Sequence, residues 1–157
     1  MKSVARRPDF ARWGWLLTRA ALGGVFLYAG VIKAGGSEEF ALALVPFTIL
    51  PEFWIRPFAV ALAWTEVAAG VLILLPRIHR IGSGLILMLS FLFIGVLVWA
   101  LANDIIVSCG CFGNDAPPSA FAMRLAVGRD VVIAAAAAFA LVFRPCLLYT
   151  SPSPRDS

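Results

Sequence analysis

The sequence predicts an all-α protein, a bundle of four membrane-spanning helices with both termini in the cytoplasm. Of its 157 residues, 61% are hydrophobic and only 14% are charged, whereas a soluble domain carries about 25% charged residues. A span needs roughly 20 apolar residues, so the chain accommodates about four spans and short loops. That length leaves no room for a separate soluble catalytic domain, which excludes Rossmann, P-loop and barrel enzymes.

The first three spans follow from long apolar blocks. Residues 13–33 are interrupted only at Thr18 and Arg19, and at about 1.5 Å per residue they can cross a ~30 Å hydrocarbon core. This block exceeds the apolar region of a secretory signal peptide, and no A-x-A-like cleavage site follows closely, so we expect a retained span. The second span is expected at 57–75 and the third at 81–102, because both blocks are apolar on most faces.

The fourth apolar block, 131–143, is too short to cross a membrane by itself. Either its helix begins earlier, near Leu125, and draws Arg129 and Asp130 into the membrane, or its far end is missing. We place the fourth span at about 125–143.

The last residues, 146–157, resemble the conceptual translation of a transposase adapter used to prepare sequencing libraries. We therefore expect an artefactual tail and treat 1–145 as a single four-span membrane domain. A genuine polar tail rich in proline and serine is the alternative. If the tail is artefactual, Cys146 is not biological, and two of the three cysteines remain as a pair.

Lysine and arginine in the short loops predict the orientation of the bundle. One side of the bundle carries Lys2, Arg6, Arg7, Arg12, Arg77, Arg80 and Arg144. The other side carries Arg56 and Arg124 together with five acidic residues. The first side is predicted to be cytoplasmic, so loops 34–56 and 103–124 face outward. Membrane topology thus explains the net charge of +4, and we expect a lipid bilayer and no nucleic acid as partner.

The first outward loop, 34–56, carries many large apolar side chains around its breaks at Pro46 and Pro51. This pattern favours a segment that lies in the membrane interface, with Trp54 at headgroup depth. A loop that packs on the neighbouring helices is the alternative.

The sharpest local signal is a five-residue segment in the second outward loop. It consists of Cys109, Gly110, Cys111, Phe112 and Gly113. On the outward side two thiols can form a disulfide, and a glycine between them gives the backbone freedom to bring the sulfurs together. So small a ring is strained, and strained, exposed disulfides behave as exchange partners rather than as structural cross-links. Two buried small residues, or an inert local bridge, are the alternatives.

A metal site has less support in this sequence, and we assign no metal ligands. Structural zinc requires four ligands, whereas the two thiols have only Met123 near them and the lone His79 lies in a cytoplasmic turn. A Cu(I) site with two thiolates stays open on chemical grounds.

Charged residues inside the predicted spans form a second group of candidates. Glu66 lies in the middle of the second span, where an ionised carboxylate is costly unless it is paired, protonated or hydrated. In the first span Arg19, Phe26 and Lys33 recur every seven residues and share one helix face. We expect the first two spans to pack through this face, with Glu66 meeting Arg19 or Lys33. The small residues that would allow a close approach are Gly23, Gly30 and Gly70.

These charges have more than one possible role. A buried ion pair can fix the register of two helices, whereas a charged stripe can also move protons or hold a quinone headgroup, so a quinone is the candidate cofactor. Arg19 can otherwise extend to the cytoplasmic interface. Near the outer end of the fourth span, Arg129 and Asp130 form an adjacent interfacial pair or place positive charge beside the cysteines, which would lower a thiol pKa.

Taken together, these residues resemble a known family. The pattern comprises Arg19, Leu22, Gly23, Phe26, Ala29, Gly30 and Lys33, then Glu66 and Gly70, the Cys109 to Gly113 segment, and Arg129 with Asp130. It is similar to the membrane proteins grouped as MauE/DoxX-like, and more closely to the methylamine utilisation protein MauE branch. The resemblance covers nearly the whole chain before the tail. It implies a four-helix bacterial inner-membrane protein associated with extracytoplasmic redox chemistry, as MauE-like proteins are linked to maturation of methylamine dehydrogenase.

Three functions are consistent with these observations. In the leading hypothesis, Cys109 and Cys111 exchange between dithiol and disulfide with a periplasmic protein or a thioredoxin-like carrier, as a component of a thiol-disulfide oxidoreductase system. The second hypothesis is a non-catalytic assembly or accessory subunit, in which the cysteine loop shapes a docking surface. The third is a small transporter that uses Glu66 as a proton or ion site.

Overall fold

The computed structural model describes residues 10–47, 51–106 and 119–143. The elements in this part of the chain are α1 (Phe10–Gly35), α2 (Ser37–Leu44), the 3-10 helix η1 (Val45–Phe47), α3 (Glu52–Leu74), α4 (His79–Ala102) and α5 (Ala120–Val142). Four of these described helices, α1, α3, α4 and α5, are long and apolar enough to cross a membrane. The predicted all-α, four-span fold is therefore confirmed, while the cytoplasmic placement of the termini stays a prediction.

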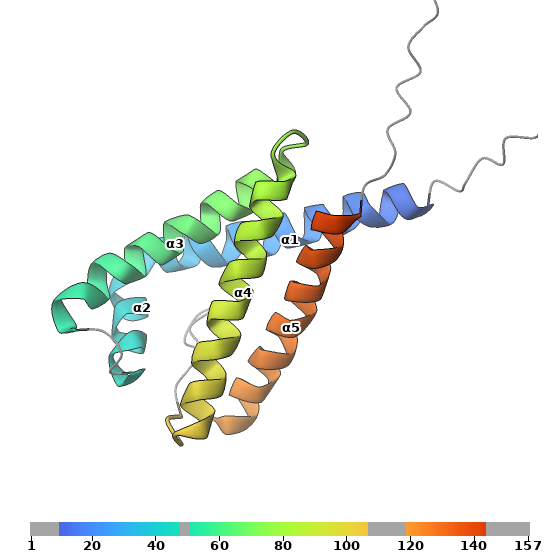
Figure 1. Ribbon diagram of the computed structural model, residues 1–157. Coiled ribbons are helices and arrows are strands. Elements are labelled where there is room, and N and C mark those ends of the chain that lie inside the picture. Colours follow the sequence, from blue (N-terminus) through green and yellow to red (C-terminus); the bar gives the residue numbers. More distant parts are fainter. Residues whose placement is uncertain (1–9, 48–50, 107–118, 144–157) are drawn as a thin grey trace, which may run out of the picture.

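The four long helices associate as two pairs (Figure 1). Helix α1 packs along α3, and α4 packs along α5. Contacts between α3 and α4 join the two pairs, whereas α1 and α5 touch much less. The interior between the pairs is therefore lined by α1 and α3 on one side and by α4 and α5 on the other.

Glycines allow α1 and α3 to approach closely. A β-carbon added at Gly30 would lie 2.8 Å from the backbone nitrogen of Val67, and one added at Gly70 would lie 2.9 Å from that of Leu27. Because backbone atoms cannot move aside as a side chain can, these positions require glycine. The predicted packing of the first two spans through their small-residue faces is confirmed.

Two spans begin earlier than the apolar pattern suggested. Helix α3 starts at Glu52, so Pro57 lies inside it rather than at its start; a proline this near an N-terminus disturbs only one early carbonyl. Helix α5 starts after Ser119, whose Oγ accepts a hydrogen bond from the Ala122 nitrogen at 3.1 Å. This N-cap satisfies one of the unpaired backbone groups of the first turn.

The first interhelical loop contains a short helix of its own. Helix α2 places Phe40 in the core and packs against α3. Its last residue, Leu44, also contacts a cluster of apolar side chains near the end of α4 and the start of α5, formed by Leu97, Ala100, Met123 and Ala126. Helix α2 thus lies at the end of the bundle where the chain leaves α4 and enters α5.

Candidate functional site

The centre of the bundle holds a buried ion pair between α1 and α3. Lys33 Nζ lies 2.5 Å from Glu66 Oε1, and the two side chains are only 2% and 1% exposed. The Lys33 ammonium also lies 4.8 Å from the ring centre of Phe93 and 5.2 Å from that of Phe40, distances at which aromatic faces attract a cation. Residues from three other helices, α2, α3 and α4, therefore surround this one ammonium group.

Arg19 binds the end of α3 and does not meet Glu66. Its Nε and Nη2 donate to the Ile73 carbonyl at 2.8 and 2.7 Å, and Nη2 also donates to the Leu74 carbonyl at 3.0 Å. The last carbonyls of a helix have no partner within the helix, so a guanidinium from a neighbouring helix can satisfy them. Of the two partners predicted for Glu66, the structure selects Lys33, and Arg19 is buried against the last residues of α3.

A second ion pair lies on α5. Arg129 Nε donates to Asp130 Oδ1 at 2.9 Å, and Asp130 is buried while Arg129 is partly exposed. Because α5 begins at Ala120, these residues fall in the middle of the helix rather than near its outer end, where the sequence analysis placed them. The earlier start of α5 is the physical reason for this correction.

A small cavity brings the two ion pairs together. Its volume is about 30 Å³, and its lining includes all four charged residues, Lys33, Glu66, Arg129 and Asp130. The other lining residues are Val25, Phe26, Ser90, Phe93 and Ile133. A cavity of this size has no room for a quinone ring, since pockets for organic ligands measure some 300–1,000 Å³. Arg19 does not line it.

Three residues around Lys33 did not emerge from the sequence. Phe93 and Ser90 line the cavity from α4, and Phe40 covers Lys33 from α2. One available signal was the spacing of Ser83 and Ser90, seven residues apart in an otherwise apolar helix and both buried. That spacing matches the repeat of the charged stripe on the first span.

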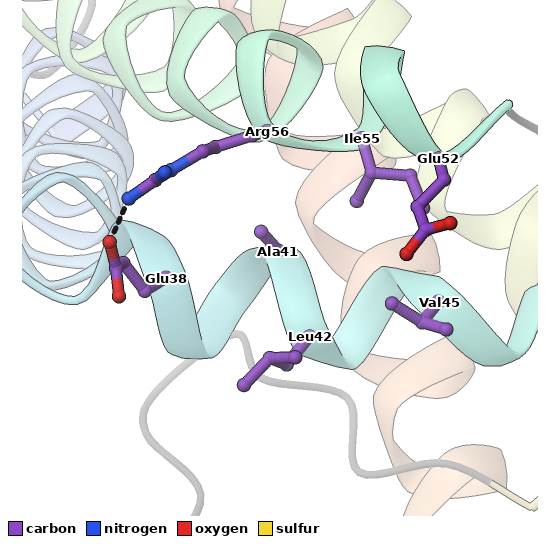
Figure 2. A pocket seen from close by; sticks show the side chains of 7 residues that line it. All are labelled: Glu38, Ala41, Leu42, Val45, Glu52, Ile55 and Arg56. Carbon is purple, nitrogen blue, oxygen red and sulfur yellow. Dashed lines mark hydrogen bonds and ion pairs between the residues drawn. The ribbon is translucent and has the colours of Figure 1, made fainter.

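An open groove lies between α2 and the start of α3. Its volume is about 270 Å³, and Figure 2 shows Arg56 reaching from α3 to Glu38 on α2, with which it forms an ion pair. The remaining lining residues are Ala41, Leu42, Val45, Glu52 and Ile55. The groove therefore combines a mainly apolar floor with charged groups at its rim.

The cysteine segment lies outside the described residues. Cys109, Gly110, Cys111, Phe112 and Gly113 all belong to the connection between α4 and α5. The described helix ends on either side of this connection, Ala102 and Ala120, lie at the end of the bundle that carries α2.

Four apolar spans around an interior cluster of charges define a multi-pass membrane protein. The chain belongs to the MauE family, since the family model described as methylamine utilisation protein MauE matches residues 11–143. It is therefore a bacterial membrane protein, as the resemblance of its charged and cysteine motifs implied.

Two curated relatives carry the same name. The chain is 32% identical over 110 residues to the Methylamine utilization protein MauE of Methylorubrum extorquens, covering 69% of this chain and 58% of the relative. It is 25% identical over 112 residues to the protein of that name from Methylophilus methylotrophus, covering 71% and 57%. The chain thus spans less than two thirds of the length of these relatives. No solved structure matches it.

Proposed function

We propose that this membrane protein exchanges disulfides with an extracytoplasmic protein through Cys109 and Cys111. The observation that carries the proposal is a pair of thiols, two residues apart, in the one connection between α4 and α5 of a MauE-family chain. Arg77, in the turn between α3 and α4, and Arg80, in the first turn of α4, lie at the opposite end of the bundle. By the distribution of positive charge, the cysteine end faces outward, where thiols can be oxidised.

The exchange is balanced without a further oxidant. One cysteine thiolate attacks a disulfide of the partner and displaces one partner thiolate, which forms a mixed disulfide. The second cysteine then attacks the mixed disulfide, which leaves the chain oxidised and the partner as a dithiol. Two electrons and two protons thereby pass from the cysteine pair to the partner, and the reverse sequence oxidises a partner dithiol.

The partner we propose is a disulfide-containing protein of methylamine utilisation, or a thioredoxin-like carrier that serves it. The name that the two curated relatives bear supports the metabolic context, and the resemblance of the motifs to the MauE branch supports a role in the maturation of methylamine dehydrogenase. In this proposal the buried ion pairs hold the helices that present the cysteine segment.

Differential alkylation in intact spheroplasts tests the proposal. A membrane-impermeant thiol reagent should label Cys109 and Cys111 only after reduction, whereas a cysteine introduced by Arg77→Cys in the turn between α3 and α4, at the predicted cytoplasmic end, should stay unlabelled until the membrane is permeabilised. One of the two single variants, Cys109→Ser or Cys111→Ser, should accumulate a mixed disulfide that is absent from the Cys109→Ser/Cys111→Ser variant, and the variant that does so retains the attacking cysteine. Thiols that are never oxidised, or are labelled only after permeabilisation, would contradict the proposal.

The groove between α2 and α3 favours a second candidate, a non-catalytic assembly subunit. Leu42, which lines the groove, and Phe53 and Trp54, which neighbour the lining residues of α3 in sequence, are 54 to 74% exposed and offer apolar surface for docking a partner. This candidate predicts that the double cysteine variant retains its function, while a Leu42→Glu substitution abolishes co-purification of the partner. Thiol exchange predicts the opposite result for the cysteine variant.

A further inference from the structure

Two buried carboxylates beside the central cavity each have one oxygen without a partner. Glu66 uses Oε1 to bind Lys33, and Asp130 uses Oδ1 to bind Arg129. Within the described part of the chain, Glu66 Oε2 and Asp130 Oδ2 accept no hydrogen bond, although the two residues are only 1% and 4% exposed. Both residues line the same cavity. Among the residues that line this cavity, two buried acceptors thus lack a donor.

The cavity has the size and polarity of a water site. On a comparable measure a buried water needs roughly 10–15 Å³ and two to four polar partners, and this cavity measures about 30 Å³. Ser90 does not donate a hydrogen bond to either carboxylate oxygen, since its Oγ donates to the Ile86 carbonyl at 2.9 Å. The bilayer core cannot supply one either, because it holds no water to solvate an exposed acceptor.

We infer that this cavity binds one water molecule, which donates one proton to Glu66 Oε2 and the other to Asp130 Oδ2. The two O–H groups of a single water match the two missing donors. Lys33 Nζ, which has three protons and donates one of them to Glu66, is placed to donate to the water oxygen. A neutral ligand also suits the site better than a metal cation, because the two ion pairs already balance in charge.

The water joins the α1 and α3 pair to α5, a helix that α1 contacts only lightly. Lys33 and Glu66 belong to the α1 and α3 pair, whereas Asp130 belongs to α5, and α1 packs only lightly on α5. With the water in place, the two ion pairs form one hydrogen-bonded network. This inference does not depend on the cysteine chemistry.

Radiolytic hydroxyl-radical labelling of the wild-type chain in lipid nanodiscs tests for the water directly. Radicals formed at a bound water oxidise the side chains around it, so Phe26, which lines the cavity, should be oxidised several-fold faster than Phe40. The two rings are matched, being 6% and 7% exposed, and Phe40 does not line the cavity. Equal rates for the two rings would overturn the inference.

A double-mutant cycle tests whether the two carboxylates act together. The losses in melting temperature for Glu66→Gln and Asp130→Asn should sum to more than the loss in the double variant, since either change disrupts the shared water. Glu66→Gln combined with Glu38→Gln is the control cycle and should be additive, because Glu38 is exposed at the groove. Additive losses in the first cycle would also overturn the inference.

Discussion

Two ion pairs connect α3 to the helices before it: Lys33 of α1 binds Glu66, and Glu38 of α2 binds Arg56. Both pairs join a basic and an acidic side chain, but they differ in burial and in their place in the bundle. The Lys33 and Glu66 side chains are 2% and 1% exposed in the centre of the bundle. The Arg56 and Glu38 side chains, beside the groove, are 69% and 73% exposed. The Lys33 and Glu66 pair is enclosed by helices, whereas the Arg56 and Glu38 pair lies exposed at one end of the bundle.

Burial, rather than charge, determines how much the loss of each pair destabilises the protein. An exposed pair typically contributes about 0.2–1 kcal/mol, because its charges are already well solvated when apart. A buried pair adds little net stability by forming, but removing one partner costs about 3–5 kcal/mol, since the other charge is left uncompensated. The inner pair should therefore fix how α1 sits on α3, and the outer pair should not.

The largest effect is expected from breaking the inner pair. Lys33→Met leaves Glu66 buried without its cation and should lower the free energy of unfolding by about 3–5 kcal/mol. Thermal unfolding in detergent micelles measures the loss. The double variant Lys33→Met/Glu66→Met removes both charges and should recover most of it. If the double variant is no more stable than the single one, the ion pair is not the source of the effect.

Arg19 extends the comparison, because no carboxylate within residues 10–47, 51–106 and 119–143 pairs with this buried cation. Arg19→Ala removes the donors to the Ile73 and Leu74 carbonyls and should cost about 1.5–3 kcal/mol, the range for hydrogen bonds that involve a charged group. Hydrogen exchange of the amides in the last turn of α3 provides a local readout and should accelerate. An unchanged exchange rate there would show that Arg19 does not hold the end of α3.

Gly30 tests the close approach that brings the inner pair together. Gly30→Ala places a β-carbon against the Val67 backbone, so α1 must move away from α3, at a cost of about 1–3 kcal/mol. Gly24→Ala is the matched control, since nothing lies within 4 Å of its added β-carbon. This control should be neutral or stabilising, because alanine favours a helix over glycine. Equal losses in both variants would argue against a glycine-dependent interface.

The smallest effect is expected at the outer pair. Arg56→Gln should change the free energy of unfolding by no more than about 1 kcal/mol, and salt should reduce even that contribution. Melting temperatures of wild type and variant at low and high ionic strength measure it. A loss comparable with that of Lys33→Met would show that exposure does not separate the two pairs.

The sequence predicted that α1 packs on α3, but it did not predict how far the two helices are shifted along their axes relative to each other. A seven-residue stripe and three glycines identify the faces that meet, because they depend only on helical periodicity. Choosing Lys33 over Arg19 as the partner of Glu66 requires the depth at which α3 lies beside α1. That depth depends on where α3 begins, and an N-terminus that includes Pro57 was not evident from apolar residues alone.

The convergence of Arg129 and Asp130 on the inner pair was also not evident from the sequence. Helix α5 begins after the N-cap Ser119. Arg124 and the small residues around it interrupt the apolar pattern there, so the pattern did not indicate this start. Ser90 and Phe93 line the cavity because α4 crosses at that level, a tertiary arrangement that no local pattern encodes. The role of Cys109 and Cys111 stays a prediction, since both lie outside the described residues.

The contacts of α1 with α3 at two distant levels restrict how this part of the chain can change in length. Arg19 binds the last carbonyls of α3 and Lys33 binds Glu66, and the two residues are about 21 Å apart along the axis of α1, at 1.5 Å per residue. Inserting or deleting one residue between them would turn one contact by about 100° relative to the other. Related chains should therefore tolerate substitutions of the lipid-facing residues here far more readily than any insertion or deletion.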